Sequence, residues 1–205
     1  MGEVAMSGAE GRRIIGLTGG IATGKSTVSD YLASQYGLLV LDADVFAREA
    51  VAQGSEILRR VSDRYGSDIL LSDGSLNRSR LGEIVFHDDV EKRWVEQQVH
   101  PYVRKRFKEE TSAASSAQLL VYSIPLLFEA NLTHLVTEIW VVACSPVQQL
   151  ARLMSRSKLS KREAQARIDA QLSLAEKCDR SDYVLDNFGS REALFLQVDR
   201  LLAAS

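Results

Sequence analysis

The chain contains one segment whose residue types and spacing are those of a phosphate-binding loop. Residues 19–26 read Gly-Gly-Ile-Ala-Thr-Gly-Lys-Ser and fit the pattern Gly-x-x-x-x-Gly-Lys-Ser/Thr. Glycines let the backbone curl so that successive N–H groups face a phosphate, and the helix that follows adds partial positive charge. Lys25 can reach the β- and γ-phosphates, and the Ser26 hydroxyl can ligate Mg²⁺. The segment predicts binding of a nucleoside triphosphate, against the alternative of a glycine turn that binds nothing.

Two carboxylates follow the second predicted strand and could serve the acceptor of a phosphoryl group. Asp42 and Asp44 lie where ligands gather in open parallel sheets, at the carboxyl end of a strand. A carboxylate can orient a hydroxyl nucleophile and accept its proton. The alternative is that one aspartate caps the next helix while the other is solvated, and spacing alone leaves both readings open.

A basic segment could supply mobile positive charge for phosphoryl transfer. Between residues 152 and 167 only Glu163 is acidic. Such a cluster can close over phosphates as a lid, although a solvated basic face is the common alternative. The basic residues are Arg152, Arg156, Lys158, Lys161, Arg162 and Arg167.

Other nucleotide-binding classes lack their further motifs here. The chain has no Asn-Lys-x-Asp base-reading motif. The two Asp-x-x-Gly matches, 63–66 and 186–189, carry little weight because about one match is expected by chance. The third predicted strand ends at Ser123-Ile124-Pro125 rather than at an acidic residue. These observations weaken the GTPase-switch and motor-ATPase readings.

Alternating apolar strands and helices must position these residues. Strands are predicted at 14–17, 38–41, 118–123, 139–143 and 183–185. Helices are predicted after the loop, after Asp44, with Pro146 in the first turn, from the capping box at Ser160, and after Ser190. This alternation predicts an α/β fold with a parallel sheet.

The chain is expected to divide into a core and an insertion. A flexible lead is predicted over 1–12, the core over 13–54 and 117–205, a lid over 152–170 within it, and a helical insertion over 55–116. Residues 111–117, at the end of this insertion and the return to the core, read as an exposed linker.

Composition excludes several classes of protein. The 205 residues are 45% hydrophobic and 25% charged, with a net charge of −2, which argues against a disordered chain and against a general affinity for nucleic acid. Cys144 and Cys178 cannot form a disulfide framework, and the three histidines have no zinc-site spacing. No apolar run is long enough for a membrane span and no signal-peptide pattern is present, so a soluble cytoplasmic protein is expected, with no membrane and no obligate protein partner.

Several ordered motifs resemble one family, the dephospho-coenzyme A kinases. The resemblance spans residues 14 to 202, and no motif carries it alone. The motifs are Gly16-Leu-Thr-Gly-Gly-Ile21 with Gly24–Thr27, Asp42-Ala-Asp44 with Ala47-Arg48, Leu76-Asn-Arg78 with Leu81-Gly82 and Val85-Phe86, His100-Pro101, Pro125-Leu-Leu-Phe-Glu129, Arg152 with Arg156, Arg167-Ile168 with Gln171, and Asp182-Tyr-Val-Leu-Asp-Asn187 with Gly189-Ser190.

The resemblance implies a nucleoside-monophosphate-kinase-like P-loop fold with five parallel strands. It implies transfer of the ATP γ-phosphate to the ribose 3′-hydroxyl of dephospho-CoA, which gives CoA and ADP. Catalytic roles are implied for Lys25, Arg152, Arg156 and for Asp44 as proton acceptor. Mg²⁺ would be held by Ser26, with Asp44 the leading candidate for a second ligand. ATP contacts are implied for Gly20, Ala22, Thr23, Gly24, Lys25, Ser26, Thr27 and Asn187, and the candidate substrate contacts are Asp42, Arg78, His100 and Arg104.

Departures from the family pattern leave specific questions. Ala22 stands where the family usually has glycine, and it is strained only if its φ is positive. Asn77 replaces a common aspartate, and Arg180-Ser181-Asp182 replaces a common Ala-Asp. His100 could instead be a structural residue at a helix boundary. Two rival functions stay open at this point: a P-loop kinase for another nucleotide or nucleoside, and a regulator that binds ATP without transferring phosphate.

Overall fold

A computed structural model describes residues 11–204 of the chain. The backbone divides into two compact units, one formed by residues up to Asp42 together with those from Ala114 onward, and the other by Ala43–Ala113. The lead predicted over 1–12 lies outside the described residues except at its end, where Arg12 is buried and donates to the Ala114 carbonyl at 2.9 Å.

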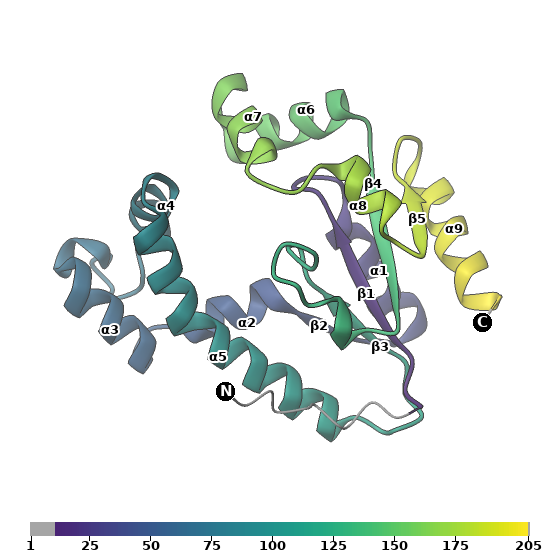
Figure 1. The fold of residues 1–205 in the computed structure, drawn as a ribbon, viewed down its shortest axis with the longest axis horizontal. Helices are drawn as coiled ribbons and strands as arrows, with labels where there is room; N and C mark the ends of the chain where they lie inside the picture. Colours follow the sequence, from purple (N-terminus) through teal and green to yellow (C-terminus); the bar gives the residue numbers. More distant parts are fainter. Residues whose placement is uncertain (1–10, 205) are drawn as a thin grey trace. The chain divides into compact units, whose positions relative to one another are not determined.

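A five-stranded parallel sheet forms the centre of the first unit (Figure 1). The strand order is β2-β3-β1-β4-β5, so β1 lies in the middle between β3 and β4. Both faces of a parallel sheet are normally covered, and β1 and β3 are buried at every residue, whereas the edge strand β5 is mostly exposed. The strands are β1 (Ile14–Gly19), β2 (Leu39–Asp42), β3 (Leu120–Ser123), β4 (Glu138–Ala143) and β5 (Tyr183–Asp186).

The core of this unit forms where helices meet one face of the sheet. Val28 and Leu32 of α1 and Leu194 and Val198 of α9 are fully buried in one cluster with strand residues such as Trp140. The helices of the unit are α1 (Lys25–Tyr36), α6 (Pro146–Ser157), α7 (Lys161–Asp169), α8 (Leu174–Asp179) and α9 (Arg191–Ala203), with a short 3₁₀ turn at Thr133–Leu135.

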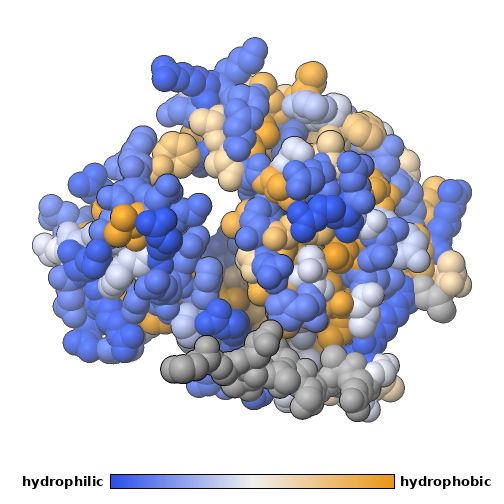
Figure 2. Space-filling model, viewed as in Figure 1, coloured by the Kyte–Doolittle hydropathy of each residue, from blue (hydrophilic) through white to orange (hydrophobic). Residues whose placement is uncertain are grey.

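The second unit is helical and has its own small core. One cluster of buried apolar residues in this unit consists of Val51, Leu58, Val61, Ile69 and Leu76. On the face drawn in Figure 2, helices α3 to α5 present mostly hydrophilic side chains. The elements are α2 (Ala43–Ala50), α3 (Glu56–Tyr65), a 3₁₀ turn at Ser67–Ile69, α4 (Arg78–His87) and α5 (Asp89–Ala113).

The predicted fold class, an α/β fold with a five-stranded parallel sheet, is confirmed. The local signals for helix ends are confirmed as well. Ser160 forms a capping box, Ser190 caps α9, and Pro146 lies in the first turn of α6, as expected. Ser145, which was not predicted as a cap, forms a second capping box at α6, and Gly37 ends α1 in the left-handed region at φ 63°. The division predicted from the sequence, with its insertion at 55–116, stays a prediction beside the observed grouping of 43–113.

Two local predictions about the helical insertion are wrong. Helix α5 continues to Ala113, so the exposed linker predicted over 111–117 begins later than expected. His100 lies inside α5 rather than at a helix boundary, although Pro101 follows it. A proline in a helix interior costs about 3 kcal/mol, but α5 is anchored on both sides of it, by Trp94 and Val99 in the unit's core and by Phe107 against Phe46.

The described helices were compared with the length and apolar character of a membrane span. None of those between residues 11 and 204 combines the length and the apolar character that a membrane-spanning helix needs.

Candidate active site

The phosphate-binding loop connects the central strand β1 to helix α1. Gly24, which begins α1, has φ 107°, a left-handed conformation that L side chains rarely adopt. A Cβ at this glycine would also collide with the side-chain amide of Asn187. Gly24, the N-cap of α1, has no side chain to cap the helix, so the partial positive charge of this N-terminus suits an anion.

Side chains from distant segments hold the loop from outside. Thr23 is buried, and its hydroxyl donates to the Gly20 carbonyl at 2.9 Å. The Thr23 carbonyl accepts from the Asn187 amide at 2.7 Å and from Arg152 at 3.5 Å. The backbone of the loop is therefore fixed before any nucleotide arrives.

Ala22 resolves the question that the sequence left open at this position. Its φ is 62°, in the left-handed region. The strained alternative therefore applies, because Cβ is crowded there in a residue other than glycine.

Lys25 is held at the carboxyl edge of the sheet by two neighbours. Its ammonium lies 3.3 Å from Asp42 Oδ2 and donates to the Ser123 hydroxyl. Ser123 in turn donates to Asp42 Oδ2 at 2.5 Å, and parallel register aligns these two residues on β3 and β2. The Lys25 and Asp42 side chains are only 14% and 23% exposed, which strengthens their attraction.

The contacts of Ser123 with Lys25 and Asp42 were not predicted from the sequence. The one available signal was its place at the end of the third strand, at the same edge as the loop. A serine there is common enough that this signal could not have singled it out.

A pocket of about 480 Å³ joins the loop to helix α6. This volume lies in the range of small-molecule sites. Its lining combines the loop with the predicted lid arginines, namely Ala22, Gly24, Ser26, Ala151, Arg152, Ser155 and Arg156.

The two predicted lid arginines differ in their surroundings. Arg152 is partly buried and donates to the carbonyls of Thr23 and Asn187, so it is part of the loop's support. Arg156, one turn later, is exposed at the pocket. The remaining basic side chains of the segment, Lys158, Lys161, Arg162 and Arg167, are exposed on α7 or just before it.

Asn187 is buried in the turn after β5. Its backbone N–H donates to the Ala143 carbonyl at 2.7 Å, and its side chain holds Thr23. The structure thus brings Asn187 to the phosphate-binding loop, while the predicted contact with adenine stays a prediction.

The other predicted substrate and acceptor residues belong to the helical unit. Asp44 is exposed in the first turn of α2, and Arg78 is exposed at the start of α4. His100 and Arg104 are exposed on α5, four residues apart and therefore on one helix face. Their predicted roles stay predictions.

The departures in this family pattern have local structural explanations. Asn77 caps α4, because its side-chain oxygen accepts from the Arg80 N–H at 3.1 Å as an aspartate would. Asp182 accepts from the Ile139 N–H at 2.7 Å and thereby joins β4 to the start of β5. Neither departure disturbs the loop.

The two cysteines are free thiols, as expected from the sequence. Burial raises the pKa of both the Cys144 and the Cys178 thiol above its ordinary value, which keeps them protonated at neutral pH. They are therefore poor nucleophiles and poor metal ligands.

The central strand leads into a Gly-x-x-x-x-Gly-Lys-Ser loop, and two arginines of α6 line the pocket beside it. The lysine of the loop is paired with Asp42 at the carboxyl edge of the sheet. This fold and site define a P-loop kinase. The family profile described as dephospho-CoA kinase matches residues 13–192. The chain belongs to the dephospho-CoA kinase family.

Individual relatives agree with this assignment. A dephospho-CoA kinase from Trichormus variabilis is 57% identical over 188 residues, covering 92% of this chain and 95% of the relative. One from Synechococcus elongatus is 51% identical over 191 residues, covering 93% and 91%.

Two solved structures extend the agreement to the fold. A crystal structure from Thermus thermophilus has a TM-score of 0.80 and 36% identity, covering 94% of this chain and 97% of the other. The dephospho-CoA kinase from Campylobacter jejuni has a TM-score of 0.65 and 26% identity, covering 92% and 96%.

Proposed function

We propose that the protein transfers the γ-phosphate of ATP to the 3′-hydroxyl of the ribose of dephospho-CoA, giving CoA and ADP. Family membership over residues 13–192 supports the substrate. The observation that carries the chemistry is the pocket shared by the phosphate-binding loop and the arginines of α6.

In the reaction the bond between the γ-phosphorus and the β,γ-bridging oxygen breaks, and a bond from the ribose 3′-oxygen to that phosphorus forms. Loop N–H groups, the N-terminus of α1 and Lys25 bind the phosphates and oppose their charge. Arg156 lines the pocket and is suited to neutralise charge on the transferred group. Arg152 holds the Thr23 carbonyl and so keeps the loop in shape.

The 3′-hydroxyl must lose its proton as the new bond forms. Asp42 already accepts hydrogen bonds from Lys25 and Ser123. Asp44 is exposed in the first turn of α2, two positions further along the chain, and is proposed to orient the hydroxyl and accept its proton.

Mg²⁺ is the proposed metal cofactor. Among residues 11–204 no group of three or more potential ligand side chains is gathered to hold an ion. This suits Mg²⁺ in a kinase, which takes one or two protein ligands and completes its shell with water and substrate phosphates. The Ser26 hydroxyl lines the pocket and fits that role, and Asp44 is the proposed second ligand. When bound, the ion would offset the negative charge of the phosphate oxygens.

Further contacts and the place of action are also proposals. Asp42, Arg78, His100 and Arg104 are proposed to contact dephospho-CoA, and Asn187 to lie near the adenine of ATP. The free thiols of Cys144 and Cys178 support action in the cytoplasm, where thiols stay reduced.

Replacing Asp44 by asparagine tests the proposed proton acceptor. The variant should bind ADP without Mg²⁺ with unchanged affinity, and its acceptor-dependent ADP release should fall on the order of a hundredfold or more, because general-base catalysis contributes about that much. Asp63→Asn, an exposed aspartate of α3, serves as the matched control and should release ADP at the wild-type rate. Near wild-type turnover of Asp44→Asn would remove Asp44 from this role.

A further inference from the structure

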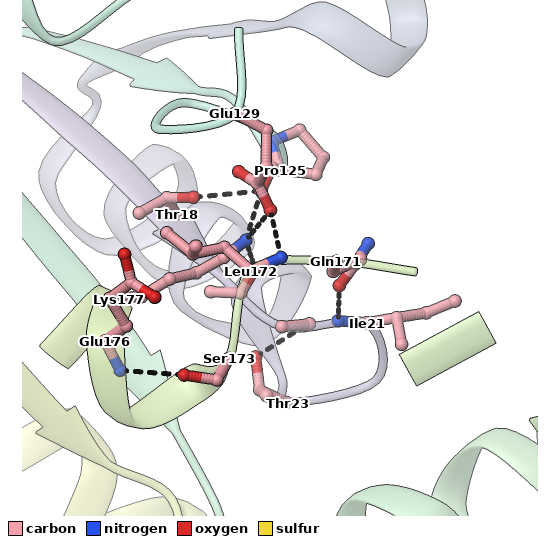
Figure 3. A network of polar contacts seen from close by, with 12 residues as sticks. Thr18, Ile21, Thr23, Pro125, Glu129, Gln171, Leu172, Ser173, Glu176 and Lys177 are labelled. Carbon is pink, nitrogen blue, oxygen red and sulfur yellow. Dashed lines mark hydrogen bonds and ion pairs between the residues drawn. The ribbon is translucent and has the colours of Figure 1, made fainter. Parts of the chain in front are cut away.

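Lys177 of α8 is a fully buried lysine that the proposed chemistry does not use. Its ammonium lies 2.8 Å from the Glu129 carboxylate, 3.2 Å from the Pro125 carbonyl oxygen and 3.4 Å from the Gly19 carbonyl oxygen (Figure 3). A lysine ammonium has three donors, so these three acceptors match its capacity.

Stability alone does not explain this buried pair. Removing a lysine and a carboxylate from water costs free energy that commonly cancels their attraction, and a well-packed apolar pair of similar size does as well. The side chain of Lys177 has no exposed surface, while that of Glu129 is 23% exposed. The contribution of the pair is therefore to be sought in the groups that it orients.

One of those groups is the first carbonyl of the phosphate-binding loop. A loop that turns its N–H groups toward a phosphate turns its carbonyls outward, and each buried carbonyl there needs a donor. Lys177 donates to Gly19, the last residue of β1. Three other loop carbonyls also accept from side chains: Gly20 from Thr23 at 2.9 Å, Ile21 from Gln149 at 2.9 Å and Thr23 from Asn187 at 2.7 Å.

The same network reaches the segment that follows the basic helix α7. Glu129 accepts from the Leu172 N–H at 3.0 Å as well as from Lys177. The adjacent Gln171 side chain accepts from the Ile21 N–H in the loop at 2.8 Å (Figure 3). The loop is thus joined to residues 171–172 at two points. Ile21 contacts Gln171 directly, and Gly19 is linked to Leu172 through Lys177 and Glu129.

We propose that Lys177, held by Glu129, is a positioning residue for the phosphate-binding loop. It fixes the orientation of the Gly19 peptide and couples the loop to residues 171–172, without touching the nucleotide. Removing the pair lets this peptide rotate and weakens the binding of the nucleotide phosphates. The inference rests on the proposed function only in taking an adenine nucleotide as the ligand.

The test compares ADP binding, measured by calorimetry, in the wild type and in the double variant Lys177→Met/Glu129→Gln. The double change leaves neither charge unpaired. The ADP dissociation constant should rise on the order of tenfold, the worth of about one hydrogen bond to a charged group. The KM for ATP should rise by a similar factor, while kcat at saturating ATP falls less than about threefold.

Two further variants separate positioning from simple loss of stability. Val198→Ala opens a cavity in the core between α9 and the sheet, and it should lower the melting temperature while leaving the ADP dissociation constant unchanged. Glu129→Gln alone keeps the shape and the hydrogen-bonding oxygen of the side chain but leaves the Lys177 ammonium without a countercharge, and it should raise the ADP dissociation constant about threefold or more.

The proposal is overturned by an ADP dissociation constant within about twofold of wild type in the folded double variant, since one hydrogen bond is worth more than that. If the double variant does not fold, the same result in Glu129→Gln overturns it. ADP binding needs no phosphate acceptor, so a failure of dephospho-CoA as substrate would leave this measurement valid.

Discussion

Ala22, in the phosphate-binding loop, has a backbone conformation that is unfavourable for an alanine. Its φ of 62° is ordinary for glycine, but it crowds the Cβ of an alanine. The left-handed conformation costs an alanine about 1–2 kcal/mol. Ala22 also lines the pocket, so the strain lies in the backbone that would face the phosphates.

Replacing Ala22 by glycine should stabilise the protein. Relief of the strain is partly offset by the greater entropy of glycine in the unfolded chain, about 0.4–1 kcal/mol. The free energy of unfolding should therefore rise by about 0.5–1 kcal/mol, measured by urea denaturation.

A matched control uses the same substitution in a helix. Ala166 is exposed within α7, so Ala166→Gly should lower the free energy of unfolding, by about 1 kcal/mol where that helix unfolds with the rest of the chain. Equal destabilisation by both substitutions would contradict the strained conformation at Ala22.

Helix α7 depends on its cap more than on burial. Only Ala164 is buried among its nine residues, whereas Ser160 and Glu163 form a complete capping box. The Ser160 side chain accepts from the Glu163 N–H at 3.3 Å, and Glu163 accepts from the Ser160 N–H at 2.8 Å. This helix carries Lys161, Arg162 and Arg167, three of the basic residues of the lid predicted from the sequence.

Ser160→Ala should loosen α7 without unfolding the protein. Loss of an N-cap costs about 1 kcal/mol, which corresponds to roughly a fivefold faster hydrogen exchange of the α7 amides. Amides of β1 in the same sample provide the internal control and should exchange at an unchanged rate. Unchanged protection of α7 would show that its packing, rather than its cap, holds it.

Helices α3 and α5 are joined by a charged cluster. The guanidinium of Arg64 binds both oxygens of Glu91 at 2.7 Å and lies 4.6 Å from the centre of the Trp94 ring, while the Tyr65 hydroxyl donates to Glu91 at 2.6 Å. Hydrogen bonds from Arg64 and then Tyr65 lower the pKa of Glu91 from 4.5 to about 2.

The sign of this shift predicts acid sensitivity. Because the pKa of Glu91 is lower in the folded state, its contribution to stability is complete above about pH 4.5 and is lost as the pH falls toward 2. Glu91→Gln should therefore lower the melting temperature at pH 7 and reduce its decline between pH 4.5 and 2. The control Glu96→Gln, on the same helix, should leave that pH profile unchanged. A wild-type profile in Glu91→Gln would contradict the cluster's role.

Local sequence signals predicted much of the molecule because short segments determine them. The loop motif, the apolar strands and the serine caps each depend on a few neighbouring residues, and the structure has them where they were expected. The continuation of α5 through Pro101 could not be predicted, because contacts distant along the chain override the local preference of proline.

The contacts that hold the site in place could not be predicted from neighbouring residues in the sequence either. Lys177 and Glu129 lie 48 positions apart, and nothing near either residue in the sequence identifies its partner. The same holds for Ser123, whose pairing with Asp42 depends on the order of the strands in the sheet. The sequence showed that Ala22 would be strained at a positive φ, but only the structure gives the value of that φ.

At the scale of the whole molecule, the proposed function predicts that the phosphate is transferred to one acceptor atom, the 3′-oxygen of dephospho-CoA. The most direct measurement incubates the protein with Mg²⁺, dephospho-CoA and ATP labelled with ¹⁸O in its γ-phosphate, and identifies the product by mass and by fragmentation at the ribose. The expected products are ADP and CoA that carries the labelled phosphate on the 3′-oxygen, with no ADP release without dephospho-CoA. ADP formed at the same rate without an acceptor, or label on any other atom, would contradict the proposed function.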